Sequence, residues 1–233
     1  MKQRVALVLL LAGKGTRLYE DIGVKKQFYL LKGKELFLYT LERMLDVGFF
    51  TDIVFVIDDE DKEKVKEALK KISIPQEIFL SFALGGKDRN ESVYHGLEKL
   101  KETYGKEDSP VFLHDADRVL VNPDVLRELF EESRHYKALT TVLPVHDSLL
   151  KEKDGEITYV DRSSLYQIQT PQVFAFQTIL SLYENGYDPS DTDDFKKAVK
   201  AKVSCHLVRG DIATFKVTEK DDLSLLEKIL VHE

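Results

Sequence analysis

The sequence has one cysteine, no tryptophan and no hydrophobic run long enough to span a membrane. Its single thiol, Cys205, cannot form an intrachain disulfide, and its apolar-alternating surroundings indicate core packing. The apolar run at residues 5–12 ends in Gly13-Lys14-Gly15 and shows no small-residue cleavage pattern. We therefore expect a cytoplasmic protein that does not bind a membrane.

Excess positive charge is also absent. The chain has 34 Lys and Arg residues against 41 Asp and Glu residues, which gives a formal net charge of -7. This balance argues against nucleic acid as a partner, so any anion site must be a local cluster of cations. A chain of 233 residues, 43% of them hydrophobic, can bury one substantial core, and we expect a single domain over residues 1–233.

The first half of the chain repeats a short apolar strand, a loop and an amphipathic helix. This order is typical of an α/β fold, in which parallel strands are covered by helices on both faces. Strands are expected at residues 5–11, 53–57, 78–84 and 111–113, and helices at residues 36–47, 61–72, 91–100 and 123–135.

The pattern changes after residue 135. A strand at 138–145, a charged turn at 151–155 and a returning strand at 157–160 predict a hairpin arm within residues 138–168. Because the arm has a polar tip and few core-facing residues, we expect it to pack on a second copy of the chain. The remaining pattern predicts helices at 178–185 and 193–201, a strand at 203–208, a strand-like stretch at 215–218 and a final helix from residue 219.

A glycine-rich loop, Ala12-Gly13-Lys14-Gly15-Thr16-Arg17, directly follows the first strand. Backbone N–H groups in such a loop can approach phosphate oxygens, and the start of the next helix adds positive potential. The spacing fits neither the Walker A pattern nor the dinucleotide fingerprint. Together with Lys25 and Lys26 the loop predicts a local anion site; the alternative is a tight turn followed by a solvated basic face.

A second candidate, His114-Asp115-Ala116-Asp117-Arg118, follows the strand at 111–113 and should reach the same sheet edge. Asp115 is the preferred ligand for Mg²⁺, which binds through one or two carboxylates together with phosphates. We expect His114 to be a structural hydrogen-bonding residue. Asp117 is either a second metal ligand or the ion-pair partner of Arg118.

Three further segments carry polar groups that could line a site. After Gly85-Gly86, Asn90 could cap a helix whose first turn projects the Ser92 hydroxyl, and the alternative is a capped helix only. Around Pro171 the chain should be extended, and the neighbouring uncharged groups, including Thr170, suit recognition. Lys216 could meet phosphates or lie on the surface.

In this order, the segments resemble the 2-C-methyl-D-erythritol 4-phosphate cytidylyltransferase family almost end to end. The specific matches are Ala12 to Arg17, Lys26-Gln27, Gly85-Gly86 with Arg89 and Ser92-Val93, His114-Asp115-Ala116 with Arg118, Asp161-Arg162, Thr170-Pro171-Gln172, Thr192-Asp193-Asp194 and Lys216-Val217-Thr218. The resemblance implies a Rossmann-like nucleotidyltransferase three-layer sandwich with a mostly parallel sheet and a protruding β-hairpin arm. It also implies CTP as donor, 2-C-methyl-D-erythritol 4-phosphate, a small phosphorylated polyol, as acceptor, Mg²⁺ or another divalent cation, and a homodimer joined through the arm.

The resemblance further implies roles for individual residues, with Arg162 delivered from the partner subunit's arm. The catalytic residues are Arg17, Lys26 and Lys216. The nucleotide-binding residues are Ala12, Gly13, Lys14, Gly15, Gly86, Ser92 and Arg118. The acceptor-binding residues are Asp115, which also holds the metal, Ser148, Arg162, Thr170 and Thr192.

Some positions depart from the family pattern. The family commonly has Ala-Arg-Pro where this chain has Asp117-Arg118-Val119, proline in place of Lys25, and threonine in place of Ser148. Two alternatives remain open. One is D-ribitol 5-phosphate cytidylyltransferase, which shares the fold and most motifs, and the other is a nucleotide-binding protein on the same fold that has no catalytic activity.

Overall fold

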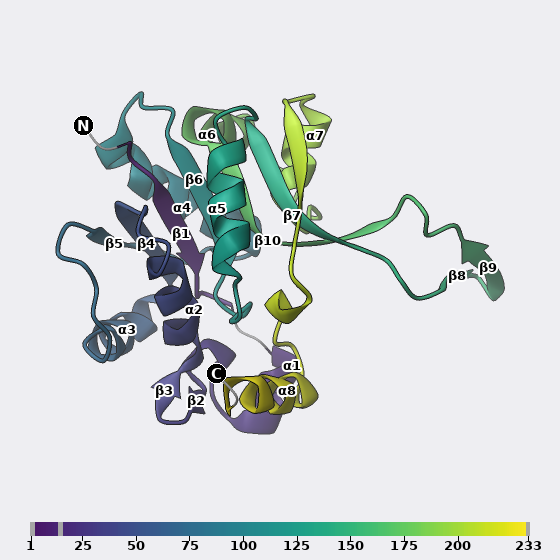
Figure 1. The fold of residues 1–233 in the computed structure, drawn as a ribbon, viewed down its shortest axis with the longest axis horizontal. Helices are drawn as coiled ribbons and strands as arrows, with labels where there is room; N and C mark the ends of the chain where they lie inside the picture. The colour runs from purple at the N-terminus through teal and green to yellow at the C-terminus, as the bar shows by residue number, and fades with distance from the viewer. Residues whose placement is uncertain (1–2, 14–15, 232–233) are drawn as a thin grey trace.

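A seven-stranded sheet forms the centre of the computed structural model, which describes residues 3–13 and 16–231, with Thr16 and Arg17 as backbone only (Figure 1). Its strand order within the described residues is β11-β7-β10-β6-β1-β4-β5, and β10 alone runs antiparallel to its neighbours. The strands are β1 (Ala6–Leu10), β4 (Asp52–Ile57), β5 (Phe79–Leu84), β6 (Pro110–Asp115), β7 (Ala138–Pro144), β10 (Tyr166–Ala175) and β11 (Cys205–Arg209).

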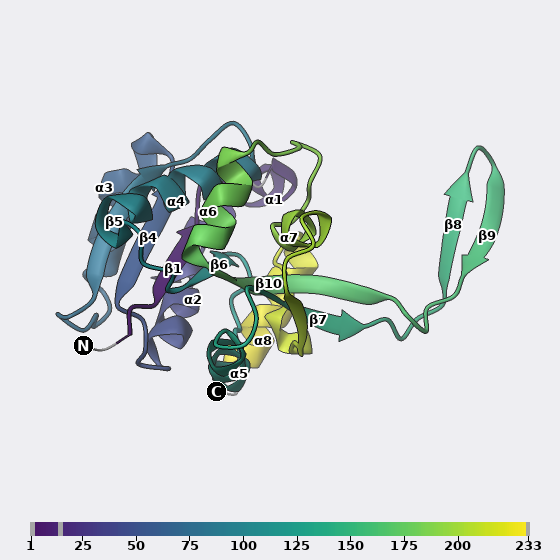
Figure 2. The same cartoon turned by 90° about the horizontal axis from the view of Figure 1, so that it is seen from above.

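Helices cover both faces of this sheet because alternate residues of the buried strands point to opposite sides. In β1, Leu7 and Leu9 pack against one helical layer, whereas Ala6 and Val8 pack against the other. The first layer comprises α2 (Leu36–Leu45), α3 (Lys62–Leu69) and α5 (Pro123–Glu132), and the second comprises α4 (Arg89–Tyr104), α6 (Phe176–Glu184) and α7 (Phe195–Lys200). Figure 2 shows α2 and α5 on one side of the sheet and α4 and α6 on the other, which confirms the expected three-layer α/β architecture.

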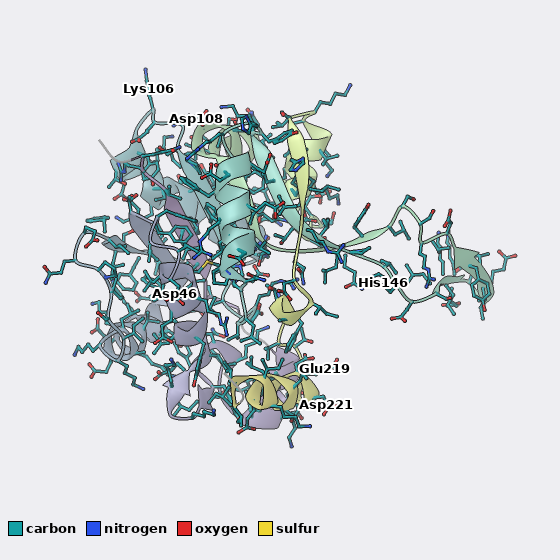
Figure 3. All side chains as sticks on the ribbon, viewed as in Figure 1. Asp46, Lys106, Asp108, His146, Glu219 and Asp221 are labelled. Atoms are coloured by element: carbon teal, nitrogen blue, oxygen red, sulfur yellow. The ribbon has the colours of Figure 1, made fainter. Side chains whose placement is uncertain are left out.

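A smaller apolar cluster joins the N-terminal loop region to the C-terminal helix. Leu18, Leu31, Val217 and Leu226 are buried together in it. The elements involved are α1 (Thr16–Ile22), the 3-10 helix η1 (Lys26–Phe28), the short strands β2 (Leu30–Leu31) and β3 (Lys34–Glu35), and α8 (Lys220–Val231), which starts beside the labelled Glu219 in Figure 3. This packing brings the segment that carries Lys216 next to the segment that carries Lys26.

Several expectations about local structure were wrong. The N-cap of α4 is Asp88, whose side chain accepts from the Glu91 N–H, because Asn90 already lies within the helix. Residues 215–218 form no strand and follow a 3-10 helix, η3 (Ile212–Thr214), as irregular chain. Residues 151–153 belong to a strand, so the turn is confined to Asp154 and Gly155.

The antiparallel strand β10 was expected only as an extended path around Pro171. It occupies the middle of the sheet between β6 and β7, and its pairing with β7 shifts register between Gln169 and Gln172. The irregularity coincides with the Thr170–Pro171 peptide, which is cis. Proline has no N–H to donate to a ladder, which is consistent with the bulge there.

The arm extends from β7 and β10 and ends in a separate two-stranded sheet (Figures 1 and 2). Its strands are β8 (Leu149–Lys153) and β9 (Glu156–Val160), and His146, labelled in Figure 3, lies on the connection. Leu150, Ile157 and Tyr159 are largely exposed, with 81% of Tyr159 accessible. Among the described residues, no helix is both long and apolar enough to cross a membrane.

Gly96 provides a test of the packing between α4 and the sheet. A Cβ at this position would lie 2.7 Å from Val8 Cγ1 and 3.0 Å from Val56 Cγ2, both on buried strands. Although alanine is the better helix former, overpacking typically costs about 1–3 kcal/mol, and we expect Gly96→Ala to lower the free energy of unfolding. Urea denaturation measures this change. The exposed Glu98→Ala on the same helix is the control. If Gly96→Ala were as stable as the unaltered chain or more stable, that result would contradict the packing.

Candidate functional site

Loops from four parallel strands meet at the carboxyl edge of the sheet. Ala12 follows β1, Asp58 follows β4, Gly85 follows β5, and Asp115 ends β6. A Cβ on Gly85 would lie 2.3 Å from the Ala12 Cβ, so only glycine permits this approach of the two loops. The convergence agrees with the tendency of open α/β sheets to bind ligands at this edge.

A cavity of about 350 Å³, called here the first cavity, opens between these loops. It brings together Ala12 and Gly13 of the glycine-rich loop, Gly86 and Ser92 of the double-glycine segment, and Lys26 with Lys216. Its lining consists of Leu10, Ala12, Gly13, Lys26, Asp58, Gly86, Lys87, Asp88, Arg89, Ser92, Asp115, Asp117 and Lys216.

Side-chain hydrogen bonds fix the backbone of the loops around this cavity. The buried Gln27 amide donates to the carbonyls of Leu11 and Gly13, which holds the end of the β1 loop. Ser92 Oγ accepts from the Gly86 N–H at 2.9 Å and donates to the Asp88 carbonyl at 2.9 Å. The Ser92 hydroxyl therefore shapes the double-glycine loop at the start of α4, close to where the sequence predicted it.

Lys26 and Lys216 project from opposite ends of the chain to the same wall of the first cavity. Lys26 Nζ pairs with Asp117 Oδ2 and donates to the Val217 carbonyl at 3.1 Å. Lys216 Nζ lies 2.8 Å from Asp115 Oδ2 and 3.6 Å from Asp117 Oδ2. Burial lowers the pKa of Lys216, but the charges of Asp115 and Asp117 outweigh this effect and keep the pKa above its ordinary value. Asp117 thus pairs with Lys26 and Lys216. It does not pair with Arg118, which the sequence had suggested as one possible partner.

Asp115 is held by cations on both of its oxygens. Arg89 Nε donates to Asp115 Oδ1 at 3.0 Å, and the same guanidinium reaches the fully buried Asp194 at 2.8 Å. Burial would raise the pKa of Asp115, but the charges of Arg89 and Lys216 outweigh burial and hold that pKa well below its usual range. Asp115 is therefore an ionised carboxylate at neutral pH.

His114 has the structural role expected of it. It is fully buried, and burial lowers its pKa to about 3, so its ring is neutral. Nε2 lies 3.1 Å from the Arg118 carbonyl, which can only accept, so Nε2 carries the proton. Nδ1 then accepts from the Thr170 hydroxyl at 3.1 Å, and that oxygen accepts from the Asp115 N–H at 3.2 Å.

A second cavity of about 280 Å³ lies next to the first and shares Arg89, Asp115 and Lys216 with it. The remaining lining is mostly polar. It consists of Arg118, Ile168, Gln169, Thr170, Gln172, Thr192 and Asp193. Arg118, which the resemblance assigns to the nucleotide, lines this cavity together with Thr170 and Thr192, which it assigns to the acceptor. The shared wall places Lys216 and Asp115 within reach of ligands on both sides.

Some predicted residues lie elsewhere. Ser148 and Arg162 are exposed on the connections to the outer hairpin and line neither cavity. Lys25 turns toward Asp58, Glu60 and Asp61, with distances of 2.6–2.8 Å, and so does not join Lys26. Lys14, Gly15 and the side chain of Arg17 fall outside the described residues.

Arg89 and Asp194 are site residues to which no role was assigned from the sequence. Both belong to short motifs that were recognised, the segment after Gly85-Gly86 and the Thr192-Asp193-Asp194 segment. An arginine at the start of a helix and an aspartate 105 positions later give no local signal of pairing. Gln172 reinforces the arrangement, because its Oε1 accepts from the N–H groups of Asp194 and Phe195.

Comparisons with known proteins agree with this site. The family model for 2-C-methyl-D-erythritol 4-phosphate cytidylyltransferase (IspD) matches residues 5–232. The 2-C-methyl-D-erythritol 4-phosphate cytidylyltransferase of Thermotoga neapolitana is 33% identical over 225 residues, which cover 95% of each chain. The ribitol-5-phosphate cytidylyltransferase of Lactiplantibacillus plantarum is 28% identical over 227 residues, covering 95% of this chain and 96% of that protein.

Solved structures give the same fold. The 4-diphosphocytidyl-2C-methyl-D-erythritol synthase of Anaerococcus prevotii superposes with a TM-score of 0.83 at 22% identity, covering 99% of this chain and 97% of that one. At this identity the likeness carries the fold alone. With the family match along nearly the whole sequence, it confirms the resemblance seen in the motifs: the chain belongs to the 2-C-methyl-D-erythritol 4-phosphate cytidylyltransferase family.

Proposed function

We propose that this chain transfers the cytidylyl group of CTP to 2-C-methyl-D-erythritol 4-phosphate, releasing pyrophosphate. The observation that carries the proposal is the position of Lys26 in the first cavity beside Lys216 and Asp115, which line both adjacent cavities, in a member of this family. CTP would occupy the first cavity, beside the glycine loops. The phosphorylated acceptor would occupy the second, beside Thr170 and Thr192.

The reaction is an in-line displacement at the α-phosphorus of CTP. An oxygen of the acceptor phosphate forms the new bond, and the bond from the α-phosphorus to the bridging oxygen of pyrophosphate breaks. The acceptor phosphate is already anionic, so no general base is needed, and the neutral, buried His114 is not required to move a proton. The protein's task is to align two anions and neutralise the growing charge, which suits the ammonium groups of Lys26 and Lys216.

The donor set also fits a divalent cation that arrives with the triphosphate. Asp115 offers a carboxylate on the wall of both cavities, and Mg²⁺ often binds through one or two carboxylates while phosphates and water complete its shell. A three-carboxylate group exists at Asp58, Glu60 and Asp61, but of these only Asp58 lines the first cavity and none lines the second. We therefore assign the metal to Asp115; when bound, Mg²⁺ would supply charge neutralisation at the phosphates.

The arm supports a homodimer as the working unit. Its exposed apolar residues, Leu150, Ile157 and Tyr159, lie on a two-stranded sheet, and such a sheet is at best marginally stable alone in water. Ser148 and Arg162 sit at the base of this hairpin and cannot act through the cavities that their own chain's residues line. In the proposed dimer, Arg162 reaches the acceptor in the partner's site.

Replacing either cavity lysine should impair catalysis. Each of Lys26→Ala and Lys216→Ala removes one charge that stabilises the transition state, a loss that typically lowers kcat about 10²- to 10³-fold. Steady-state assays of pyrophosphate release measure the effect. Lys25→Ala is the matched control, because it removes the neighbouring cation that turns away from the cavity and should leave kcat close to its original value. Near-normal turnover in both cavity variants would contradict the mechanism.

Acceptor identity is tested by competition between substrates. With CTP and Mg²⁺ present, we expect a higher kcat/KM for 2-C-methyl-D-erythritol 4-phosphate than for D-ribitol 5-phosphate, measured as pyrophosphate release. A preference for D-ribitol 5-phosphate would assign the chain to that alternative reaction. Absence of pyrophosphate release with either acceptor would favour a nucleotide-binding protein without catalytic activity.

The role of the arm is tested by complementation between subunits. Arg162→Ala should raise the KM for the acceptor, and Lys26→Ala should lower kcat. In a heterodimer of the two variants, purified through different affinity tags, about half of the sites combine an intact Lys26 with an intact arm. Such heterodimers should have more activity than either parent homodimer at low acceptor concentration. Activity no higher than that of the parents would show that Arg162 does not act across the dimer.

A further inference from the structure

Asp117 lies between the two lysines of the first cavity, and the proposed reaction gives its carboxylate no task. The residue is only 8% exposed. Its Oδ2 pairs with Lys26 Nζ and lies 3.6 Å from Lys216 Nζ. One carboxylate oxygen therefore contacts both of the ammonium groups that the mechanism directs at phosphate.

The backbone holds this carboxylate in register with the lysines. The Asp117 carbonyl accepts from the N–H of Val217 at 2.9 Å, and Val217 directly follows Lys216 in the chain. Lys26 Nζ donates to the Val217 carbonyl at 3.1 Å. These contacts hold the segments of Lys26, Asp117 and Lys216 together, and neither of them uses the Asp117 carboxylate.

The ion pairs of Asp117 leave part of the carboxylate unsatisfied. Oδ1 is buried and has no hydrogen-bond partner among the described residues. A buried carboxylate oxygen without a donor raises the free energy of the state that contains it. The pairing of Asp117 with the lysines is therefore less favourable than a pairing with an anion whose oxygens are all satisfied.

A phosphate that contacted both ammonium groups would meet the Asp117 carboxylate at close range. Two anions at this distance repel each other strongly in a partly buried site. A phosphate must therefore compete with the carboxylate for the lysines, and the competition reduces its affinity.

We propose that Asp117 is a positioning residue that takes the place of a substrate phosphate in the empty enzyme. It orients Lys26 and Lys216 toward the cavity, yields them to the triphosphate, and weakens the binding of both CTP and pyrophosphate. Weaker binding of pyrophosphate favours its release after the transfer. This inference rests on the proposed function, because it assigns the two lysines to phosphate.

The test is a gain of affinity, which general damage to the site would not produce. Isothermal titration calorimetry compares pyrophosphate binding to the unaltered chain and to Asp117→Asn, which keeps the shape and removes the charge. We expect about tenfold tighter binding by the variant, the scale of one partly screened charge contact in a partly buried site. The KM for CTP should fall with it. Asp117→Ala, which installs the residue that the family commonly carries, is the second variant should Asp117→Asn fold poorly.

Asp58→Asn is the matched control, because Asp58 lines the same cavity but pairs with Lys25 instead of the two lysines. Its affinity for pyrophosphate should change far less. The titrations are made with EDTA and again with Mg²⁺, and the tightening is expected in both. Unchanged or weaker binding by both Asp117 variants overturns the inference, and weakening with Mg²⁺ alone identifies Asp117 as a metal ligand instead. Absence of pyrophosphate binding by the unaltered chain contradicts the proposed function itself.

Discussion

The site depends on cations and carboxylates that are buried together at one edge of the sheet. Arg89 connects Asp115 to Asp194, and Lys216 connects Asp115 to Asp117. A buried charge that loses its partner typically costs about 3–5 kcal/mol, so each group constrains the next. Charges of opposite sign alternate along this chain of contacts and so stabilise the convergence of the loops.

The same alternation gives the site its chemical character. Asp115 stays ionised despite its burial because Arg89 and Lys216 face it, and Lys216 stays protonated because Asp115 and Asp117 face it. The charges that a phosphoryl transfer needs are therefore present and oriented before any substrate binds. Fixed charges of this kind require little reorganisation during the reaction, which is the usual source of electrostatic catalysis.

The sequence predicted the parts of this arrangement that depend on local pattern. Apolar runs located β1, β4, β5 and β6, and because parallel strands end at one edge, the convergence of their loops followed. The local pattern did not predict which side chains pair in the folded structure. Lys25 and Lys26 are adjacent and chemically identical, yet Lys25 pairs with the three carboxylates that follow β4 and Lys26 pairs with Asp117. Nothing in the two residues themselves distinguishes these outcomes.

The capping error has a related cause. Asp88 and Asn90 are both good N-cap residues, and two positions separate them. Burial decides between them, because Asn90 is needed inside the helix, where its amide donates to the Asp191 carbonyl and accepts from Lys197 Nζ. Such a polar contact across more than 100 positions is invisible in the local pattern.

In the proposed dimer, the arm extends the dependence on tertiary contacts to a second chain. Its hairpin has no core of its own, and Ser148 and Arg162 stand apart from the cavities of their own subunit. If the same hairpin both joins the dimer and completes the acceptor site, then a change that loosens the dimer also removes groups that recognise the acceptor. In the proposed dimer the nucleotide side has no such requirement, because no residue of the arm is assigned to CTP. Recognition of CTP and recognition of the acceptor should therefore respond differently to dimer dissociation.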